Sequence, residues 1–396
     1  MREQAMARRI RRDLGIFVPS IGAQLITTTS LFLTPLIIGA LITEAKLDET
    51  DAGSIFTVEL VASALTTLAV SAWSRPHSRR RVAMAGAALA LGAGALTMAS
   101  AAYGFLIAIR LLAGIGAGIV AAEAAAILPR SFNPERLISG LTIVGIVNGA
   151  FWLATLPYAV DRLGYRGPYA CLMLINLAGM LLLSRLPSPP MRPVLRTETS
   201  GGWPVAGWPV LGAIFLTQLG QGSFWALNEL FGARAGLDEH MIGTFLSIAT
   251  LLLLVGVGFT ALVGTRLGRY LPLFIITAIN ALSILVIAAV PDPNLYIWAN
   301  VVQAVTNLAS VVYQLGLAAS LDRTGRVVAA ASGLLGLGNG IGPSVATYIE
   351  TSVGPAELGW FVLALNAAAL MLYGLVAARA VRLPVGSLDP ERPPAE

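Results

Sequence analysis

The sequence is short of cysteine, histidine and charged residues. Its 396 residues include one cysteine and two histidines, and only 12% of them are Asp, Glu, Lys or Arg. A single cysteine excludes an intrachain disulfide and a thiolate metal site, and two histidines exclude a histidine-rich metal centre. Soluble chains average about 25% charged residues, so a soluble domain of this composition would precipitate. We therefore exclude a cytosolic enzyme, a nucleic-acid-binding protein and a disulfide scaffold, and we expect no cofactor.

Hydrophobic residues, in contrast, make up 56% of the chain. They gather in twelve stretches of the length that a helix needs to cross a bilayer, which is about 20 residues. The first stretch follows a basic N-terminal segment but is too long for the core of a signal peptide, so we interpret it as an uncleaved first span. The expected spans are 14–42, 52–73, 82–101, 104–128, 137–160, 168–186, 207–232, 241–263, 270–290, 294–320, 327–350 and 357–380.

The basic residues orient these spans. If the N-terminus is cytoplasmic, 21 of the 26 Lys and Arg residues fall in cytoplasmic segments, four fall on the opposite side, and Arg110 lies inside a span. Short cytoplasmic loops of membrane proteins carry an excess of Lys and Arg. The distribution predicts a multi-pass protein of the bacterial inner membrane with both termini in the cytoplasm.

The longest loop divides the chain into two equal sets of spans. Residues 187–206 read PSPPMRPVLRTETSGGWPVA, which has the Pro, Gly and Ser content of a linker. The sequence therefore predicts an all-α membrane protein with a six-helix bundle over 1–186, a cytoplasmic linker over 187–206 and a second, pseudo-symmetric six-helix bundle over 207–396. Two sets of six spans with a substrate site between them are a recurring architecture of secondary transporters.

Three short motifs point to a known family. Residues 110–118, RLLAGIGAG, are similar to an Arg-x-x-x-Gly-x-Gly-x-Gly pattern on the fourth span, and residues 264–269, GTRLGR, are similar to a Gly-x-x-x-(Asp)-Arg-x-Gly-Arg loop without its acidic residue. Residues 165–169, YRGPY, are similar to a Gly-Trp-Arg-x-x-Phe stretch. With these motifs the sequence resembles the major facilitator superfamily over essentially its whole length. The resemblance implies transport by alternating access, a cavity lined by the first, fourth, seventh and tenth spans, and a role in proton coupling for Arg110.

Four charged residues lie inside the expected spans: Glu59, Arg110, Glu123 and Glu229. A charge in a bilayer costs about 2.5–3.5 kcal/mol on insertion scales, so each is a candidate for proton coupling. Glu59 and Arg110 are expected at matched depth, about 10 Å from the outer side, and Glu229 is expected to converge with them. Glu123, about 20 Å deeper than Arg110, is expected to face the inner cavity or to reach the loop at 79–81. A static salt bridge between helices is the alternative for Glu59 and Arg110.

Polar and aromatic residues at helical spacing predict a substrate cavity. Those selected as substrate-binding residues are Gln24, Thr28, Asn148, Trp152, Gln221, Trp225, Asn228, Gln303 and Asn307. The alternative for such residues is hydrogen bonding between helices, worth about 0.6 kcal/mol on average. The basic loops that follow the second and eighth spans are predicted to act in gating through Arg79, Arg80, Arg81, Arg266 and Arg269.

Glycine patterns predict close helix packing. Gly114 and Gly118 have small-xxx-small spacing on the fourth span, and several glycines precede Pro343 on the eleventh. Drug/proton antiporters of the resembled family carry a Gly-Pro motif on the fifth span, and this sequence lacks it there. That departure weakens the argument for antiport.

Together these features predict a proton-coupled transporter of a small organic molecule. Export is favoured, because a cavity that combines aromatic and carboxyl groups suits apolar or cationic compounds. Import of a nutrient is one alternative, and a non-transporting sensor or assembly protein is the other, although it would have no use for three carboxylates in the membrane. No catalytic constellation is present, so no enzyme activity is expected. The expected partners are the substrate, protons and lipid, with no nucleic acid, and the protein is expected to act as a monomer.

Overall fold

The structure, a computed structural model, describes residues 2–72, 78–128, 131, 134–187, 204–264, 266–321 and 326–382, without the side chains of 2–12, 72, 134–135 and 379–382. These residues form thirteen helices and no strand. In chain order they are α1 (Arg2–Thr43), α2 (Glu49–Ala72), α3 (Arg79–Thr97), α4 (Tyr103–Ala125), α5 (Pro134–Leu163), α6 (Arg166–Leu183), α7 (Gly207–Ala226), α8 (Asn228–Arg234), α9 (Glu239–Val263), α10 (Tyr270–Ala289), α11 (Pro293–Leu321), α12 (Arg326–Ser352) and α13 (Pro355–Arg382).

Twelve helical units cross the molecule because α7 and α8 form one broken span, bent by 48°. Nine helices in the described ranges are long and apolar enough to cross a membrane by themselves, and the bent pair makes ten. The other two, α3 and α12, pack along neighbouring spans, α3 against α4 and α6, and α12 against α2 and α7. The expectation of a continuous helix over 207–232 was wrong, because the backbone leaves helical geometry at Leu227 (φ −105°, ψ 10°).

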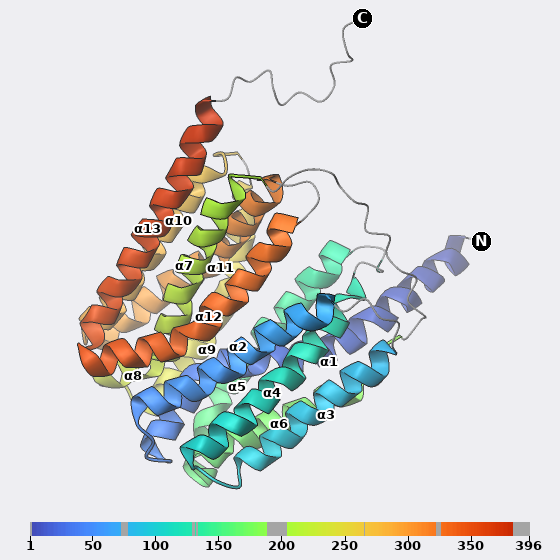
Figure 1. The fold of residues 1–396 in the computed structure, drawn as a ribbon, viewed down its shortest axis with the longest axis horizontal. Helices are drawn as coiled ribbons and strands as arrows, with labels where there is room; N and C mark the ends of the chain where they lie inside the picture. The colour runs from blue at the N-terminus through green and yellow to red at the C-terminus, as the bar shows by residue number, and fades with distance from the viewer. Residues whose placement is uncertain are drawn as a thin grey trace, which may run out of the picture.

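The helices form two bundles, α1–α6 and α7–α13, as Figure 1 shows. The main contacts between the bundles pair α2 with α12 and α5 with α9. Residues 188–203 of the expected linker lie outside the described residues. In Figure 1 the bundles converge at the end remote from the two chain termini, here called the far end, and diverge toward the opposite end, here called the terminal end.

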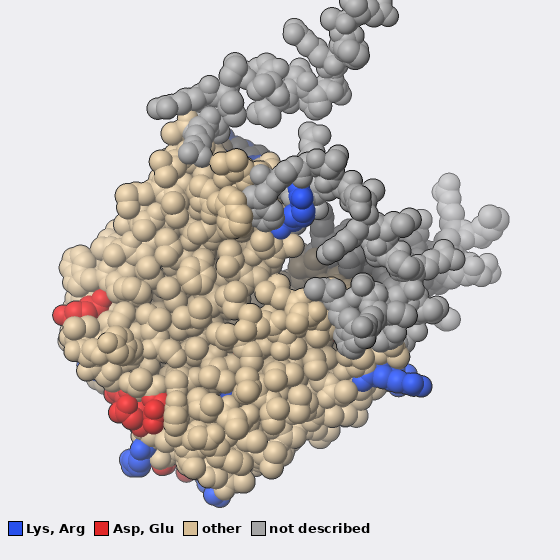
Figure 2. Space-filling view, viewed as in Figure 1, with Lys and Arg blue, Asp and Glu red and all other residues tan. Residues whose placement is uncertain are grey.

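The surface of the bundles is apolar. Leu181, Leu262 and Met371 are each more than half exposed, and Figure 2 shows few charged side chains on the face in view. Hydroxyl groups inside the helices donate to carbonyl oxygens one turn back, as Ser20 does to Ile16 at 2.8 Å and Thr34 does to Ser30 at 3.0 Å. Such bonds satisfy polar groups where no water is present.

Glycines bring α4 close to two neighbours at once. Gly114 and Gly118 lie against the backbone of α2, and the Thr67 hydroxyl donates to the Gly118 carbonyl at 3.2 Å. The close packing predicted for this glycine face is therefore confirmed. Gly116 faces the other way, toward Gly86 of α3. This packing places Arg110, on the same helix, between α2 and α3.

Gly116→Ala is expected to lower the melting temperature of the detergent-solubilised protein. A Cβ at this position would lie 2.6 Å from the Gly86 carbonyl oxygen, and such overpacking typically costs about 1–3 kcal/mol. The matched control is Gly92→Ala on α3, where a Cβ would meet nothing within 4 Å. The control is expected to leave the melting temperature unchanged or slightly raised, because Ala favours helix over Gly. Equal melting temperatures for the two variants would contradict the packing.

Candidate functional site

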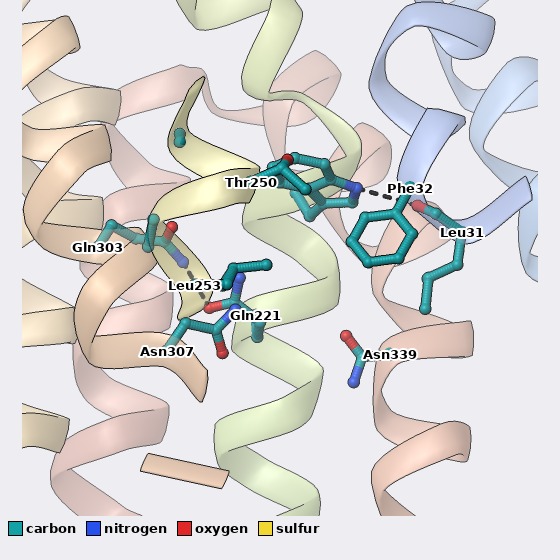
Figure 3. Close-up of a pocket in the computed structure, with 11 residues that line it drawn as sticks. Leu31, Phe32, Gln221, Thr250, Leu253, Gln303, Asn307 and Asn339 are labelled. Atoms are coloured by element: carbon teal, nitrogen blue, oxygen red, sulfur yellow. Dashed lines mark hydrogen bonds between the residues drawn. The ribbon is translucent and has the colours of Figure 1, made fainter. Parts of the chain in front are cut away.

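A cavity of about 110 Å³ lies between the two bundles. Most of its wall comes from the second bundle, through α7, α9, α11 and α12, and α1 supplies the rest. Figure 3 shows the side chains that surround it. The lining residues are Leu31, Phe32, Gln221, Trp225, Ala249, Thr250, Leu253, Gln303, Ala304, Asn307 and Asn339.

Carboxamides form the polar part of this wall. Gln303 Nε2 donates to Gln221 Oε1 at 2.9 Å, and Asn339 Nδ2 donates to Gln218 Oε1 at 2.8 Å. Gln218 Nε2 donates in turn to Gln314 Oε1 at 3.2 Å. The side chains facing the cavity are therefore held from behind by a second row of amides.

Trp225 closes the cavity on the side of the far end. Its Nε1 donates to the carbonyl oxygen of Leu31 at 3.0 Å, which joins α7 of one bundle to α1 of the other. The Phe32 ring beside it packs against Gly149 of α5. Trp225 and Phe32 both line the cavity, and Figure 3 shows the Phe32 ring next to Leu31.

A buried ion pair lies in the first bundle. Arg110 Nη1 donates to Glu59 Oε2 at 3.3 Å, and Arg110 Nη2 donates to Thr97 Oγ1 at 2.6 Å. The Ser30 hydroxyl donates to the other carboxylate oxygen, Oε1, at 2.9 Å. The guanidinium also lies 5.1 Å from the ring centroid of Tyr169. Residues of α2, α3 and α6 thus contact the Arg110 side chain of α4, and Ser30 of α1 bonds to its partner Glu59.

A second ion pair lies at the terminal end of the same bundle. Arg79 Nη1 is 3.0 Å from Glu123 Oε2, and both side chains are buried. Glu123 was expected either to face the inner cavity or to reach the segment at 79–81, and this contact corresponds to the second alternative. Arg79 is, however, the first residue of α3 and not a loop residue, so its placement in a gating loop was wrong. Its burial against Glu123 removes one positive charge from the surface of that end.

Glu229 lies apart from both ion pairs, in α8. Its carboxylate packs against Gly39 of α1 and shares a small cavity with Glu239, Pro157 and Val160. Its buried Oε2 has no hydrogen-bond partner in the described residues. Gly39 is nine residues beyond Ser30, the α1 contact of Glu59, which is about 13 Å along a helix. The predicted convergence of Glu229 with Glu59 and Arg110 is therefore wrong, and the bend at Leu227 accounts for the difference.

Further contacts join the bundles at the far end. Thr50 and Thr351 hydroxyls are 3.4 Å apart, and the Ser344 amide donates to Thr57 Oγ1 at 2.9 Å. On the opposite seam, His240 Nε2 of α9 is 2.9 Å from Asp161 Oδ2 of α5. These polar contacts on α2–α12 and α5–α9 close the far end above the cavity.

Comparison with known proteins agrees with this architecture. The family model for the Major Facilitator Superfamily matches residues 21–211, and the fold continues in α8–α13. The chain is therefore similar to the major facilitator superfamily over just under half of its length. The superfamily and its solved neighbours are membrane transporters, not enzymes.

Several solved superfamily structures share the fold at low sequence identity. A mutant of the nucleoside transporter NupG aligns with a TM-score of 0.67 and 13% identity, over 92% of this chain and 99% of its own. An auto-inhibited POT family peptide transporter aligns at 0.72 and 13%, over 96% and 99%. A POT family transporter in complex with a thioalcohol-conjugated peptide aligns at 0.74 and 14%, over 94% and 96%. No curated protein matches this chain by sequence.

Four of the predicted substrate-binding residues line the cavity: Gln221, Trp225, Gln303 and Asn307. Three polar residues on the first bundle have other neighbours. Asn148 donates to Thr29 Oγ1 at 2.8 Å, Thr28 donates to the Gln24 carbonyl at 2.8 Å, and the Gln24 amide lies against Gly145. The Asn148–Thr29 bond joins α5 to α1 and so corresponds to the interhelical alternative, whereas the Thr28 bond lies within α1.

Trp152 and Asn228 also lie outside the cavity wall. The Trp152 ring packs edge-on against Phe151, with centroids 5.1 Å apart. Asn228 is fully buried just after the break at Leu227, where its amide donates to Asn300 Oδ1 at 2.8 Å. Its carbonyl accepts a bond from the Tyr296 hydroxyl at 3.1 Å. Asn228 therefore stabilises the bend and does not face the cavity, which corrects its predicted role.

The cavity includes polar residues that the sequence analysis missed. Asn339 follows Gly338 within the glycine-rich stretch of α12, which drew attention only for close packing. A lone amide among small residues on an expected span was the available signal. Thr250 of α9 follows Ser247 by three residues and Thr244 by six, a helical spacing of hydroxyl residues that the sequence analysis did not use.

The other predicted gating arginines lie on the surface. Arg80 and Arg81 are exposed in the first turn of α3, and Arg266 is exposed after α9. Arg269 is exposed as well and donates to the Gly316 carbonyl at 3.3 Å. Their exposure at the terminal end is compatible with contacts that form in another state of a superfamily transporter.

Glu59→Gln and Arg110→Gln are each expected to destabilise the protein by about 3–5 kcal/mol, because each leaves its former partner as an unpaired buried charge. The double variant is expected to lose less than the sum of the two single losses. Chemical denaturation of the purified protein in detergent measures all four states of this cycle. Additive losses would show that the two side chains do not interact.

Proposed function

We propose that this protein is a proton-coupled secondary transporter that moves a small organic molecule across the membrane by alternating access. The observation that carries the proposal is a cavity between two bundles that are joined above it by direct contacts at the far end. Breaking those contacts while the terminal end closes would expose the same cavity to the other side. The solved neighbours named for nucleoside and peptide transport support an organic solute as cargo.

The distribution of arginine supports one orientation. Arg80, Arg81, Arg266 and Arg269 are exposed at the terminal end, and basic residues favour the cytoplasmic side. We therefore propose that the terminal end faces the cytoplasm of a bacterial cell and that the structure represents a state closed to the outside. The division of the chain at 187–206 would then separate the two moving bodies.

Glu229 is the residue that we propose to carry the proton. It lies where α8 of one bundle contacts α1 of the other, and no cation pairs with it in the described residues. Burial disfavours the charged form of a carboxyl group, so closure of the far end is easier when Glu229 is protonated. Opening to water would release the proton. Glu59 differs from Glu229 because Arg110 compensates its charge. The pair fits either of two roles in the first bundle, an ion pair that breaks during proton coupling or a static salt bridge between helices.

The structure weakens the argument for export. That preference assumed a cavity combining aromatic and carboxyl groups, and the wall described above contains no carboxylate. We therefore propose alternating access without a preference for import or export. The sign of the proton flux determines the direction of transport. A non-transporting sensor is the alternative function. A sensor would keep its activity when the two bundles are cross-linked.

Cross-linking the bundles at the far end is expected to stop transport. In a Cys171→Ala background, Thr50→Cys with Thr351→Cys places two thiols where the hydroxyls are 3.4 Å apart. Oxidation is expected to abolish substrate uptake into proteoliposomes, and a reductant is expected to restore it. The matched control joins two helices of one bundle, Thr277→Cys with Ser310→Cys, whose hydroxyls are 3.3 Å apart. Full uptake by the oxidised Thr50/Thr351 pair would refute alternating access at this seam.

Glu229→Gln is expected to abolish compound-driven proton flux, because glutamine cannot exchange a proton. Proteoliposomes with an internal pH-sensitive dye report the flux during addition of cationic, anionic and uncharged solutes. Counterflow of a labelled solute is expected to persist, since exchange needs no net proton movement. The control is Glu357→Gln, an exposed carboxylate at the start of α13. Normal flux in Glu229→Gln would show that Glu229 does not carry the proton. A wild-type protein that moves no solute would refute the transporter proposal itself.

A further inference from the structure

The cavity wall is polar but uncharged. Of the residues that line it, four carry carboxamides and one a hydroxyl, and none is acidic or basic in the part of the chain that the structure describes. The buried charged side chains of the described residues have other neighbours: Arg110 binds Glu59, Arg79 binds Glu123, Glu350 binds Arg234, and Glu229 packs at the seam. Gating, ion pairing and solute contact are thus assigned to different residues.

Several hydrogen-bonding atoms of the wall are left for a ligand. The Asn307 carboxamide makes no hydrogen bond within the described residues, and Figure 3 shows it beside Gln221 in the cavity wall. The Gln303–Gln221 bond uses one oxygen and one nitrogen, so Gln221 Nε2 and Gln303 Oε1 stay unbonded. Asn339 donates twice through Nδ2, while its oxygen accepts no bond. The set contains both donors and acceptors, which is what carboxamides offer.

The rest of the wall is apolar and partly flat. The Trp225 indole is fixed by its bond to Leu31, and the ring of Phe32, the next residue in α1, lines the same cavity. Leu253, Ala249 and Ala304 complete this surface. Aromatic faces bind flat apolar groups, so the cavity has one hydrogen-bonding side and one side suited to a ring.

We propose that the cavity binds an uncharged polar solute, with hydroxyl or amide groups that bond to Asn307, Gln221, Gln303 and Asn339 and a ring that lies against Trp225 and Phe32. An ion would lose its hydration without gaining a counter-charge, which makes a charged solute unfavourable in this wall. This inference rests on the proposed transport function and names the class of its substrate. It replaces the apolar or cationic compounds that the sequence alone favoured.

Equilibrium dialysis of the purified protein in detergent tests the class with matched probes. Uridine and glucose are the uncharged probes, and uridine monophosphate, gluconate and glucosamine are their anionic and cationic counterparts. At least one uncharged probe is expected to bind, and its charged counterparts are expected to bind at least tenfold more weakly. A charged probe that binds more tightly than its uncharged counterpart, or a lack of binding by both uncharged probes, would overturn the inference.

Two substitutions of Asn307 locate the site. Asn307→Ala is expected to weaken binding of the uncharged probe about tenfold, the effect of one lost hydrogen bond, whereas Asn176→Ala, an amide on α6 outside the wall, is expected to have no effect. Asn307→Asp keeps the shape and adds a negative charge, so glucosamine is expected to gain relative to glucose. Melting temperatures check that each variant is folded. Unchanged selectivity in Asn307→Asp would place the solute elsewhere.

The outcomes separate this inference from the transport proposal. If only charged solutes are taken up in the proteoliposome panel, the transport proposal is supported and the proposed class of uncharged substrates is refuted. Binding of uridine or glucose without any solute flux would support the cavity chemistry and refute transport.

Discussion

Hydrocarbon offers no hydrogen-bond partner, so every polar group that enters the membrane must find its partner inside the protein. This constraint accounts for most of the interior described above. Hydroxyls bond to the preceding turn, Arg110 and Glu59 neutralise each other, and amides in the second bundle bond in rows. At the break at Leu227, the Tyr296 hydroxyl donates to the Asn228 carbonyl and the Asn228 amide nitrogen donates to Asn300 Oδ1, while Asn228 Oδ1 has no partner in the described residues.

Glycine packing occurs both within a bundle and between the bundles. Inside the first bundle, Gly116 and Gly86 bring α3 and α4 to backbone contact. Across the seam, Gly243 of α9 lies against the Leu153 carbonyl of α5, and Gly53 of α2 lies against the Pro343 carbonyl of α12. The seam also carries single hydrogen bonds such as Thr50–Thr351 and Trp225–Leu31 at the far end. Such bonds contribute little individually, which suits a closure that has to open in each cycle.

The cavity wall and the ion pairs use different residues. The ion pairs Glu59–Arg110 and Glu123–Arg79 lie in the first bundle, and the partly buried pair Arg234–Glu350 joins α8 to α12 in the second. The carboxamides of the cavity wall come from α7, α11 and α12. Glu229 lies where the bundles meet and belongs to neither group. We infer that this division lets a proton act on closure of the seam without entering the solute cavity, so that coupling works through the movement of the bundles.

The sequence by itself determined the helical class, the spans, the two sets of six and the glycine face of α4, because hydropathy and small-residue spacing are properties of one segment at a time. It also indicated the Glu59–Arg110 pair, since two opposite charges at equal depth have few other partners. Only the tertiary structure decided which polar faces meet the cavity. Asn148 and Asn228 have the same helical spacing as Gln221, yet they bond to Thr29 and Asn300, and Asn339 reaches the wall from a stretch that looked like packing. The rotation of each helix, and the bend that carries Glu229 to the seam, depend on neighbours far away in the chain, and no local pattern records them.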